Sequence, residues 1–184
     1  MATQDLSINN LSKELLSDLK TGKIYAFDKM LSIFEKPIFN YVYRLVNHKQ
    51  DAEDLTQDVF IKVFKNRETI DLDKNFKSWV FKIATNTVFD WFRSKQRKPE
   101  ILFEEKALAE LTETIIDTPA YYLTEREMEK ALETIKPVYK TVLMLFYYQG
   151  FSYEEIGTIL DIPLNTVKTY IYRAKEELKK QIPK

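Results

Sequence analysis

The stretch Phe151–Lys180, FSYEEIGTILDIPLNTVKTYIYRAKEELKK, decides how the C-terminal part of this chain folds. Ser152 and Glu155 are three residues apart, the spacing at which each side chain caps the other's backbone amide, so a helix is predicted to begin at about Tyr153. Apolar residues follow at helical spacing, and Gly157 leaves room for another helix to approach. A short break containing Pro163 then precedes a second helix. The stretch therefore predicts a helix-turn-helix.

The second of these helices is predicted to have a buried side and an outward side. At about 100° per residue, one narrow arc collects the apolar residues Val167, Ile171, Ala174 and Leu178. We expect the first turn and the opposite side to contact duplex DNA, through Asn165, Thr166, Lys168, Thr169, Tyr172 and Arg173. Residues 165–184 contain six basic and two acidic residues, a balance that suits phosphate contacts. The plain alternative is the solvated face of an ordinary helical hairpin.

A second candidate nucleic-acid surface lies in residues 74–98, where seven basic residues accompany a single acid, Asp90. On a helical wheel for residues 76–93, one broad face is predicted to be core: Phe76, Trp79, Val80, Ile83, Ala84, Thr87, Val88 and Trp91. Three phenylalanines, Phe81, Phe89 and Phe92, fall on the other side. They are interleaved there with polar and basic residues, Lys82, Thr85, Asn86 and Arg93. Rings and cations in this arrangement suit unpaired bases, and packing of Phe81 and Phe89 against neighbouring helices is an equal alternative.

The segment DAEDLTQDVF, residues 51–60, predicts an amphipathic helix that binds another protein. Its buried stripe is Ala52, Leu55, Val59 and Val63. A second side is acidic and apolar and is expected to need a partner, through Glu53, Asp54, Gln57, Phe60, Ile61 and Phe64. Phosphates would be repelled there. A metal site or acid–base catalysis by the carboxylates is a weaker alternative, because no liganding loop or companion histidine accompanies them.

Composition narrows the class of protein. The chain has 184 residues, of which 45% are hydrophobic and 30% charged, and only 3 are glycine, a profile typical of a helix-rich folded protein. It has no cysteine, which excludes disulfides, thiolate metal sites and cysteine nucleophiles. Lys plus Arg and Asp plus Glu both number 28, which argues against a generic polycation. We find neither a leader nor a long apolar run, so we expect a cytoplasmic protein without membrane insertion or cofactor.

Apolar spacing and prolines predict an all-α fold of two small domains. Helical spacing recurs in residues 24–46, 51–66, 76–93, 124–147 and 152–180, with Pro37 and Pro137 each expected to mark a kink or a new helix start. Pro99 and Pro119 bracket an acidic stretch that we interpret as a linker. The expected boundaries are an N-terminal extension (1–23), a first domain (24–98), a linker (99–123) and a second domain (124–184). His48 is expected to cap a helix at the surface.

Three segments in this order resemble the bacterial RNA polymerase sigma factors, in particular the compact extracytoplasmic-function (ECF) group. DAEDLTQDVFIKVF is similar to that family's polymerase-binding helix, FKSWVFKIATNTVFDWFRSKQRK to its promoter-melting and minus-10 helix, and the helix-turn-helix to its minus-35 module. The resemblance implies partners, namely core RNA polymerase at its beta-prime clamp and beta flap, promoter DNA in duplex and single-stranded form, and an anti-sigma factor. It also implies that the acidic linker passes through polymerase near the RNA path.

The resemblance assigns roles position by position. Polymerase-binding positions are Asp54, Gln57, Asp58 and Phe60, which with Ile61 and Phe64 make up the expected partner surface. Minus-10 positions are Phe76, Asn86 and Arg93, with Trp79 in a structural role, and the expected minus-10 surface also includes Arg67, Lys74, Lys77 and Lys82. The loop Arg67–Asn75 corresponds to the segment that captures a flipped base. Relatives often have Arg where this chain has Tyr170 and Gly near Asn165, so a different promoter sequence is expected.

Two other classes of non-enzymatic protein remain as alternatives. A dimeric helix-turn-helix regulator would bind its promoter stably without polymerase. A helical adaptor that binds only proteins would be indifferent to the loss of Lys168 and Arg173. An enzyme is the weakest of the alternatives, because the sequence has no glycine-rich phosphate loop, metal cluster or nucleophile elbow.

Overall fold

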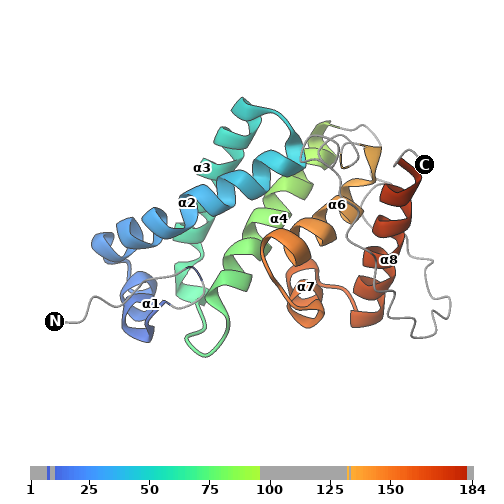
Figure 1. The fold of residues 1–184 in the computed structure, drawn as a ribbon. Coiled ribbons are helices and arrows are strands. Elements are labelled where there is room, and N and C mark those ends of the chain that lie inside the picture. Colours follow the sequence, from blue (N-terminus) through green and yellow to red (C-terminus); the bar gives the residue numbers. More distant parts are fainter. Residues whose placement is uncertain (1–7, 9–10, 96–131, 133, 182–184) are drawn as a thin grey trace. The chain divides into compact units, whose positions relative to one another are not determined.

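The computed structural model describes residues 8, 11–95, 132 and 134–181, and the regular elements in these ranges are all helical (Figure 1). The all-α prediction is confirmed. The chain divides into two compact units, residues 1–97 and 98–184. The linker expected at residues 99–123 and most of the helix expected from residue 124 lie outside the described residues.

The first unit consists of four helices and a short 3-10 turn. They are α1 (Lys13–Lys20), α2 (Ile24–Val46), α3 (Lys49–Lys65), η1 (Arg67–Thr69) and α4 (Phe76–Lys95). Figure 1 shows α2, α3 and α4 packed together, each in contact with the other two. The predicted stripe of α3 is confirmed, since Ala52, Leu55, Val59 and Val63 are all buried. Because α3 and α4 each touch two neighbours, both are buried over more than one side.

Helix α2 runs through Pro37 without interruption, so no new helix start is found there. It ends at Asn47, whose left-handed backbone (φ 53°) lets its N–H donate to the carbonyl of Tyr43 at 2.8 Å. His48 then caps the start of α3, its Nδ1 accepting from the backbone N–H of Asp51 at 3.3 Å. The surface capping role predicted for the histidine is found at the start of the next helix rather than at the end of the helix that it follows.

Helix α1 lies in the segment expected to be an extension, and it belongs to the core of the first unit. Ser12 caps it by accepting from the N–H of Leu15 at 3.2 Å, and Leu15, Leu16 and Leu19 are buried. Two lysines attach it to the segment between α3 and α4. Lys20 Nζ donates to the carbonyl of Ile70 at 2.8 Å, and Lys13 pairs with Asp73 at 2.6 Å.

The second unit contains α6 (Pro137–Leu143), α7 (Tyr153–Leu160) and α8 (Leu164–Gln181). Pro137 occupies the first turn of α6, which confirms a helix start there, and α6 continues into one π-helical turn, η2 (Met144–Tyr148). The capping box of Ser152 and Glu155 is present at the start of α7. A Cβ at Gly157 would lie 3.0 Å from the carbonyl oxygen of Ile162 and 3.8 Å from Val167 of α8, so this glycine makes room for the turn between the two helices rather than for α8 itself.

Candidate nucleic-acid and protein-binding surfaces

One side of α4 remains open along the helix, while its other sides are buried as far as Phe89. Six residues that are exposed or half-buried fall within an arc of about 100° on the helix, and we call them the α4 stripe: Trp79, Lys82, Ile83, Asn86, Asp90 and Arg93. The stripe combines an aromatic ring, an amide, two cations and one carboxylate. Trp79 and Ile83, both predicted to be core, are instead half-buried on this open side, and the Trp79 ring stacks on that of Phe76 with centroids 5.6 Å apart.

Two of the three phenylalanines expected to offer stacking surfaces, Phe81 and Phe89, are in the core, whereas Phe92 is half-buried. Phe81 and Phe89 are 0% and 3% exposed, and Phe81 packs edge-on against Tyr41 with ring centroids 5.2 Å apart. Packing against neighbouring helices, the alternative left open by the sequence, is therefore correct for both. Phe76 is buried as predicted, against Phe34, and Lys77 is only 9% exposed. Direct contact with DNA requires an exposed side chain, and neither Phe76 nor Lys77 has one.

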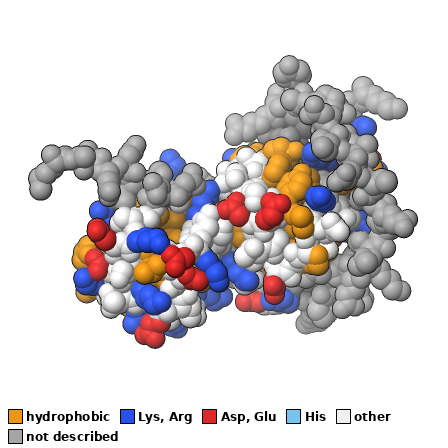
Figure 2. Space-filling model, turned by 90° about the horizontal axis from the view of Figure 1, so that it is seen from below, with side chains coloured by type: hydrophobic (Ala, Val, Ile, Leu, Met, Phe, Trp, Pro, Cys, Tyr) orange, Lys and Arg blue, Asp and Glu red, His pale blue; other side chains and the backbone are white. Residues whose placement is uncertain are grey.

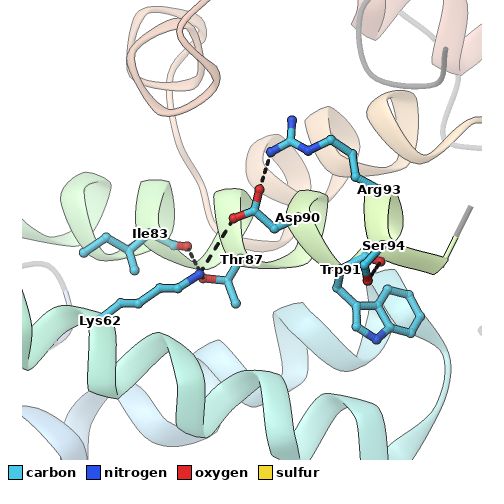
Figure 3. A network of polar contacts seen from close by, with 7 residues as sticks. All are labelled: Lys62, Ile83, Thr87, Asp90, Trp91, Arg93 and Ser94. Carbon is cyan, nitrogen blue, oxygen red and sulfur yellow. Dashed lines mark hydrogen bonds and ion pairs between the residues drawn. The ribbon is translucent and has the colours of Figure 1, made fainter. Parts of the chain in front are cut away.

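A network of polar contacts joins the α4 stripe to α3 (Figure 3). Lys62 of α3 donates to the hydroxyl of Thr87 at 3.0 Å, and its Nζ lies 3.8 Å from a carboxylate oxygen of Asp90. The other oxygen of Asp90 accepts from the guanidinium of Arg93, one turn further along α4. The Thr87 hydroxyl donates in turn to the carbonyl of Ile83 at 2.8 Å. One carboxylate therefore contacts cations from two helices.

The loop between α3 and α4 is built around a buried anchor. Ile70 is almost fully buried, and its carbonyl accepts from Lys20. The Asp71 carboxylate accepts from the N–H of Asp73 at 3.1 Å and pairs with Lys74 at 3.3 Å. The hydrogen bond from Asp73 is the main reason that the pKa of Asp71 is lowered, with Lys74 adding to it. Lys74 is exposed, as a phosphate contact requires.

Arg67, expected to face DNA, is instead partly built into the fold. Its guanidinium lies 4.6 Å from the centre of the Phe64 ring, and its Nη1 donates to the carbonyl of Phe64 at 2.9 Å. Its Nε would lie 3.0 Å from a Cβ placed at Gly22, which has a positive φ of 81°. The side chain is 26% exposed. Arg67 thus fixes the end of α3 against the turn after α1.

The acidic and apolar side of α3 is exposed, with one exception. Asp54, Gln57 and Asp58 are exposed, and Ile61 and Phe64 keep 50% and 41% of their surface exposed. Phe60 is only 7% exposed, so its expected place on this surface is wrong. It lies at the edge of the buried stripe, and α3 is covered by both α2 and α4, which widens that stripe.

Phe27 of α2 extends the apolar part of this surface, and the sequence did not reveal it. Its half-buried ring meets Phe64 edge-on at 5.3 Å. The contact joins two helices and leaves no trace in the periodicity of either. We call the set Asp54, Gln57, Asp58, Ile61, Phe64 and Phe27 the α3 surface.

The outward side of α8 is narrower than predicted. Asn165, Lys168 and Tyr172 are exposed on one side and form what we call the α8 stripe, with Thr166 half-buried beside it. Thr169, expected to face outward, is 7% exposed, because its hydroxyl turns back to donate to the carbonyl of Asn165 at 2.9 Å. That prediction is wrong. Of the predicted apolar arc, Val167, Ile171 and Ala174 are buried as expected, and Leu178 is half-buried.

Arg173 and Tyr170 are tied to the core of the second unit through Tyr139 of α6. Arg173 is half-buried, and its Nη1 donates to the hydroxyl of Tyr139 at 3.5 Å. Tyr170 is 1% exposed, and its ring packs on Tyr139 at 5.6 Å. The departure from relatives at Tyr170 therefore concerns packing in the helix-turn-helix rather than a direct base contact.

The surface view shows charges of both signs mixed (Figure 2), in keeping with a net charge of zero. Several of the described acids and lysines are paired, including Lys23 with Asp18 at 2.6 Å. No group of three or more His, Cys, Asp or Glu that could hold a metal occurs in the described ranges. None of the helices described is long and apolar enough to cross a membrane.

Comparison with known proteins matches both units to parts of one family. The sequence model of Sigma-70 region 2 matches residues 32–98, and that of Sigma-70, region 4 matches residues 125–178. The chain is 30% identical over 181 residues to the ECF RNA polymerase sigma factor SigW of Bacillus subtilis, covering 92% of this chain and 96% of that protein. It is 33% identical over 156 residues to the RNA polymerase sigma factor YlaC of the same organism, covering 82% and 88%.

A solved structure has the same fold. The sigma factor RpoE, in complex with the anti-sigma factor NepR from Bartonella quintana, superposes with a TM-score of 0.66 at 24% sequence identity, covering 86% of this chain and 97% of that one.

Proposed function

The chain belongs to the sigma-70 family of RNA polymerase sigma factors, in its ECF group, and on this premise we propose which of its residues bind polymerase and which bind promoter DNA. As a sigma factor it binds core RNA polymerase and directs initiation at specific promoters. The observation that carries the residue assignments is the pair of open polar stripes, on α4 and α8, in units that match region 2 and region 4.

The α3 surface is the polymerase-binding site in this proposal. Exposed Ile61 and Phe64, with Phe27 beside them, supply an apolar centre, and Asp54, Gln57 and Asp58 supply a polar rim. Protein interfaces combine these two parts, and the carboxylates disfavour DNA at the same place. A basic and apolar partner surface, such as the beta-prime clamp implied by the resemblance, fits it.

The α4 stripe and the loop before it are the site for the melted minus-10 strand. Asn86 can bond a base edge, Trp79 offers the edge of a ring, and Lys82, Arg93 and Lys74 can follow the backbone. No ATP is needed for this kind of strand capture, because stacking and phosphate contacts offset the cost of unpairing. The loop Arg67–Asn75 would hold a flipped base, and its anchored backbone suits a shaped pocket.

The α8 stripe is the minus-35 reader. Lys168 and Asn165 stand at the open N-terminal half of α8, the part of a recognition helix that enters the major groove. Tyr172 can pack on sugar or a thymine methyl. The Tyr139 hydroxyl holds the guanidinium of Arg173 on one side of α8. In this proposal Arg173 contacts DNA only from that side.

We assign the protein no covalent catalysis, a cytoplasmic location alongside polymerase, the domain limits 24–98 and 124–184, and an anti-sigma partner. The anti-sigma assignment is supported by the RpoE structure, in which a chain of the same fold is bound by NepR. An inhibitor that covered the α3 surface and the α4 stripe together would block both steps.

In vitro transcription tests the proposal directly. Core polymerase is incubated with a promoter library from the source genome, with and without the protein, and transcript starts are sequenced. We expect new starts that share paired upstream elements. Phe64→Ala should reduce polymerase binding, and Asn86→Ala should reduce starts while polymerase binding stays intact. Tight duplex binding without polymerase, with no new starts, would contradict the proposal.

A further inference from the structure

We propose that Asp90 is an internal substitute for a DNA phosphate. Its carboxylate holds Lys62 and Arg93 together until the promoter strand displaces it. By competing with the strand in this way, Asp90 limits the affinity of the α4 stripe for nucleic acid. The inference rests on the proposed role of the stripe in binding the melted strand. It makes Asp90 a residue that sets how selectively the stripe binds.

The contacts around Asp90 resemble those of a bound phosphate. Lys62 comes from α3 and Arg93 from α4, and both meet oxygens of the same carboxylate (Figure 3). The Thr87 hydroxyl holds Lys62 in place at 3.0 Å. Carboxylate and phosphate oxygens accept charge-assisted hydrogen bonds from the same donors, here from Arg93, while Lys62 at 3.8 Å forms an ion pair only. A backbone phosphate at this point would therefore meet two cations already brought together.

The exposure of these groups allows such an exchange. The side chains of Lys62, Arg93 and Asp90 retain 42%, 50% and 56% of their accessible surface. Ion pairs between exposed side chains contribute little to stability, so folding alone does not explain an acid at this position. Asp90 is also the single acid among the seven basic residues of residues 74–98, and it lies on the stripe rather than away from it.

The expected effect of Asp90→Asn follows from counterion release. The amide keeps the shape of the carboxylate but no longer neutralises the two cations. If one further cation engages a single strand, the slope of the logarithm of the binding constant against the logarithm of the salt concentration becomes steeper by about 0.7. Extrapolated from 1 M salt, that slope corresponds to binding tighter by about eightfold at 50 mM and about threefold at 200 mM.

The test uses the full chain bound to core polymerase and a fluorescein-labelled single-stranded DNA of random sequence, followed by anisotropy across that salt range. Asp28→Asn, which removes an exposed acid from α2, is the matched control and should change binding little. We expect Asp90→Asn to bind more tightly with the steeper slope, and to discriminate less between a promoter strand and a scrambled one. Loss of structure would weaken binding and thus cannot mimic this result.

A second background isolates the mechanism. In a chain carrying Lys62→Met and Arg93→Ala, Asp90→Asn should give no gain, because no paired cations are left to release. An equal gain there, or unchanged or weaker binding by Asp90→Asn alone, would overturn the inference. Failure of the wild-type protein to direct promoter-specific starts would overturn the proposed function instead, so the two failures are distinguishable.

Discussion

Replacing Lys168 with alanine should weaken promoter binding in a salt-dependent way, whereas Thr169→Val, one residue further, should leave binding unchanged. The two residues differ in placement. Lys168 is exposed on the α8 stripe with Asn165 and Tyr172, while Thr169 is buried and its hydroxyl bonds the carbonyl of Asn165. From the sequence alone both were expected to face DNA.

The magnitude follows from one phosphate contact on duplex DNA. Each such contact makes the slope of log affinity against log salt more negative by about 0.9. Extrapolated from 1 M salt, losing the Lys168 contact should weaken binding by about 15-fold at 50 mM salt and about fourfold at 200 mM. Thr169→Val keeps the shape of the side chain and removes one hydrogen bond, so it should lower the free energy of unfolding by about 1 kcal/mol and leave the slope unchanged.

The assay is binding of the polymerase–sigma complex to a labelled duplex promoter fragment over that salt range, with promoter selection from a randomised minus-35 element. A ratio of dissociation constants between Lys168→Ala and wild type that does not vary with salt would refute a phosphate contact by Lys168. A changed base preference in Thr169→Val would show that a buried threonine reaches DNA, and would refute the argument from burial.

Three further predictions concern the elements that support these surfaces. Ser152→Ala removes the cap of α7 and should lower the free energy of unfolding of the second unit by about 1 kcal/mol, measured by urea titration. Burial raises the pKa of the Tyr41 hydroxyl, which lies 2.7 Å from the hydroxyl of Thr85. The free energy of unfolding should therefore fall as pH rises above about 10, where tyrosine ionises in the unfolded chain. Tyr41→Phe should remove this part of the alkaline loss in a pH series of thermal melts. Lys20→Met removes the donor to the Ile70 carbonyl, so amides of residues 70–74 should exchange faster while those of α3 do not, and unchanged exchange would show that α1 does not brace the loop.

Helix positions were largely predictable because they depend on local signals. The spacing in residues 24–46 matches α2, and the capping box places the start of α7 at Tyr153. A new helix start at Pro37 was wrong: a proline in a helix removes one hydrogen bond, and the packing of α2 on α3 and α4 compensates for that loss. Helix α1 was missed because its apolar content amounts to three leucines whose burial depends on tertiary contacts.

The errors on α3 and α4 share one physical cause. A helical wheel finds a single apolar face, whereas α3 and α4 are each covered by two neighbours. Residues outside the predicted face then become core, as Phe60, Phe81 and Phe89 did. In such a helix the polar arc identifies the open side better than the aromatic residues do.

Asp90 stands out in the sequence, but its role cannot be interpreted from the sequence alone. A lone acid among cations is compatible with a solvated position, a helix-stabilising pair or a functional counter-charge. Lys62 decides between them, because it lies 28 positions earlier on a different helix, and only the packing of α3 against α4 brings it to the same carboxylate as Arg93. A pair within one helix would stabilise that helix alone. A carboxylate shared by two helices on the open side of α4 instead holds the cations where a strand's phosphate would need them, so the charge that lowers affinity also prepares the site.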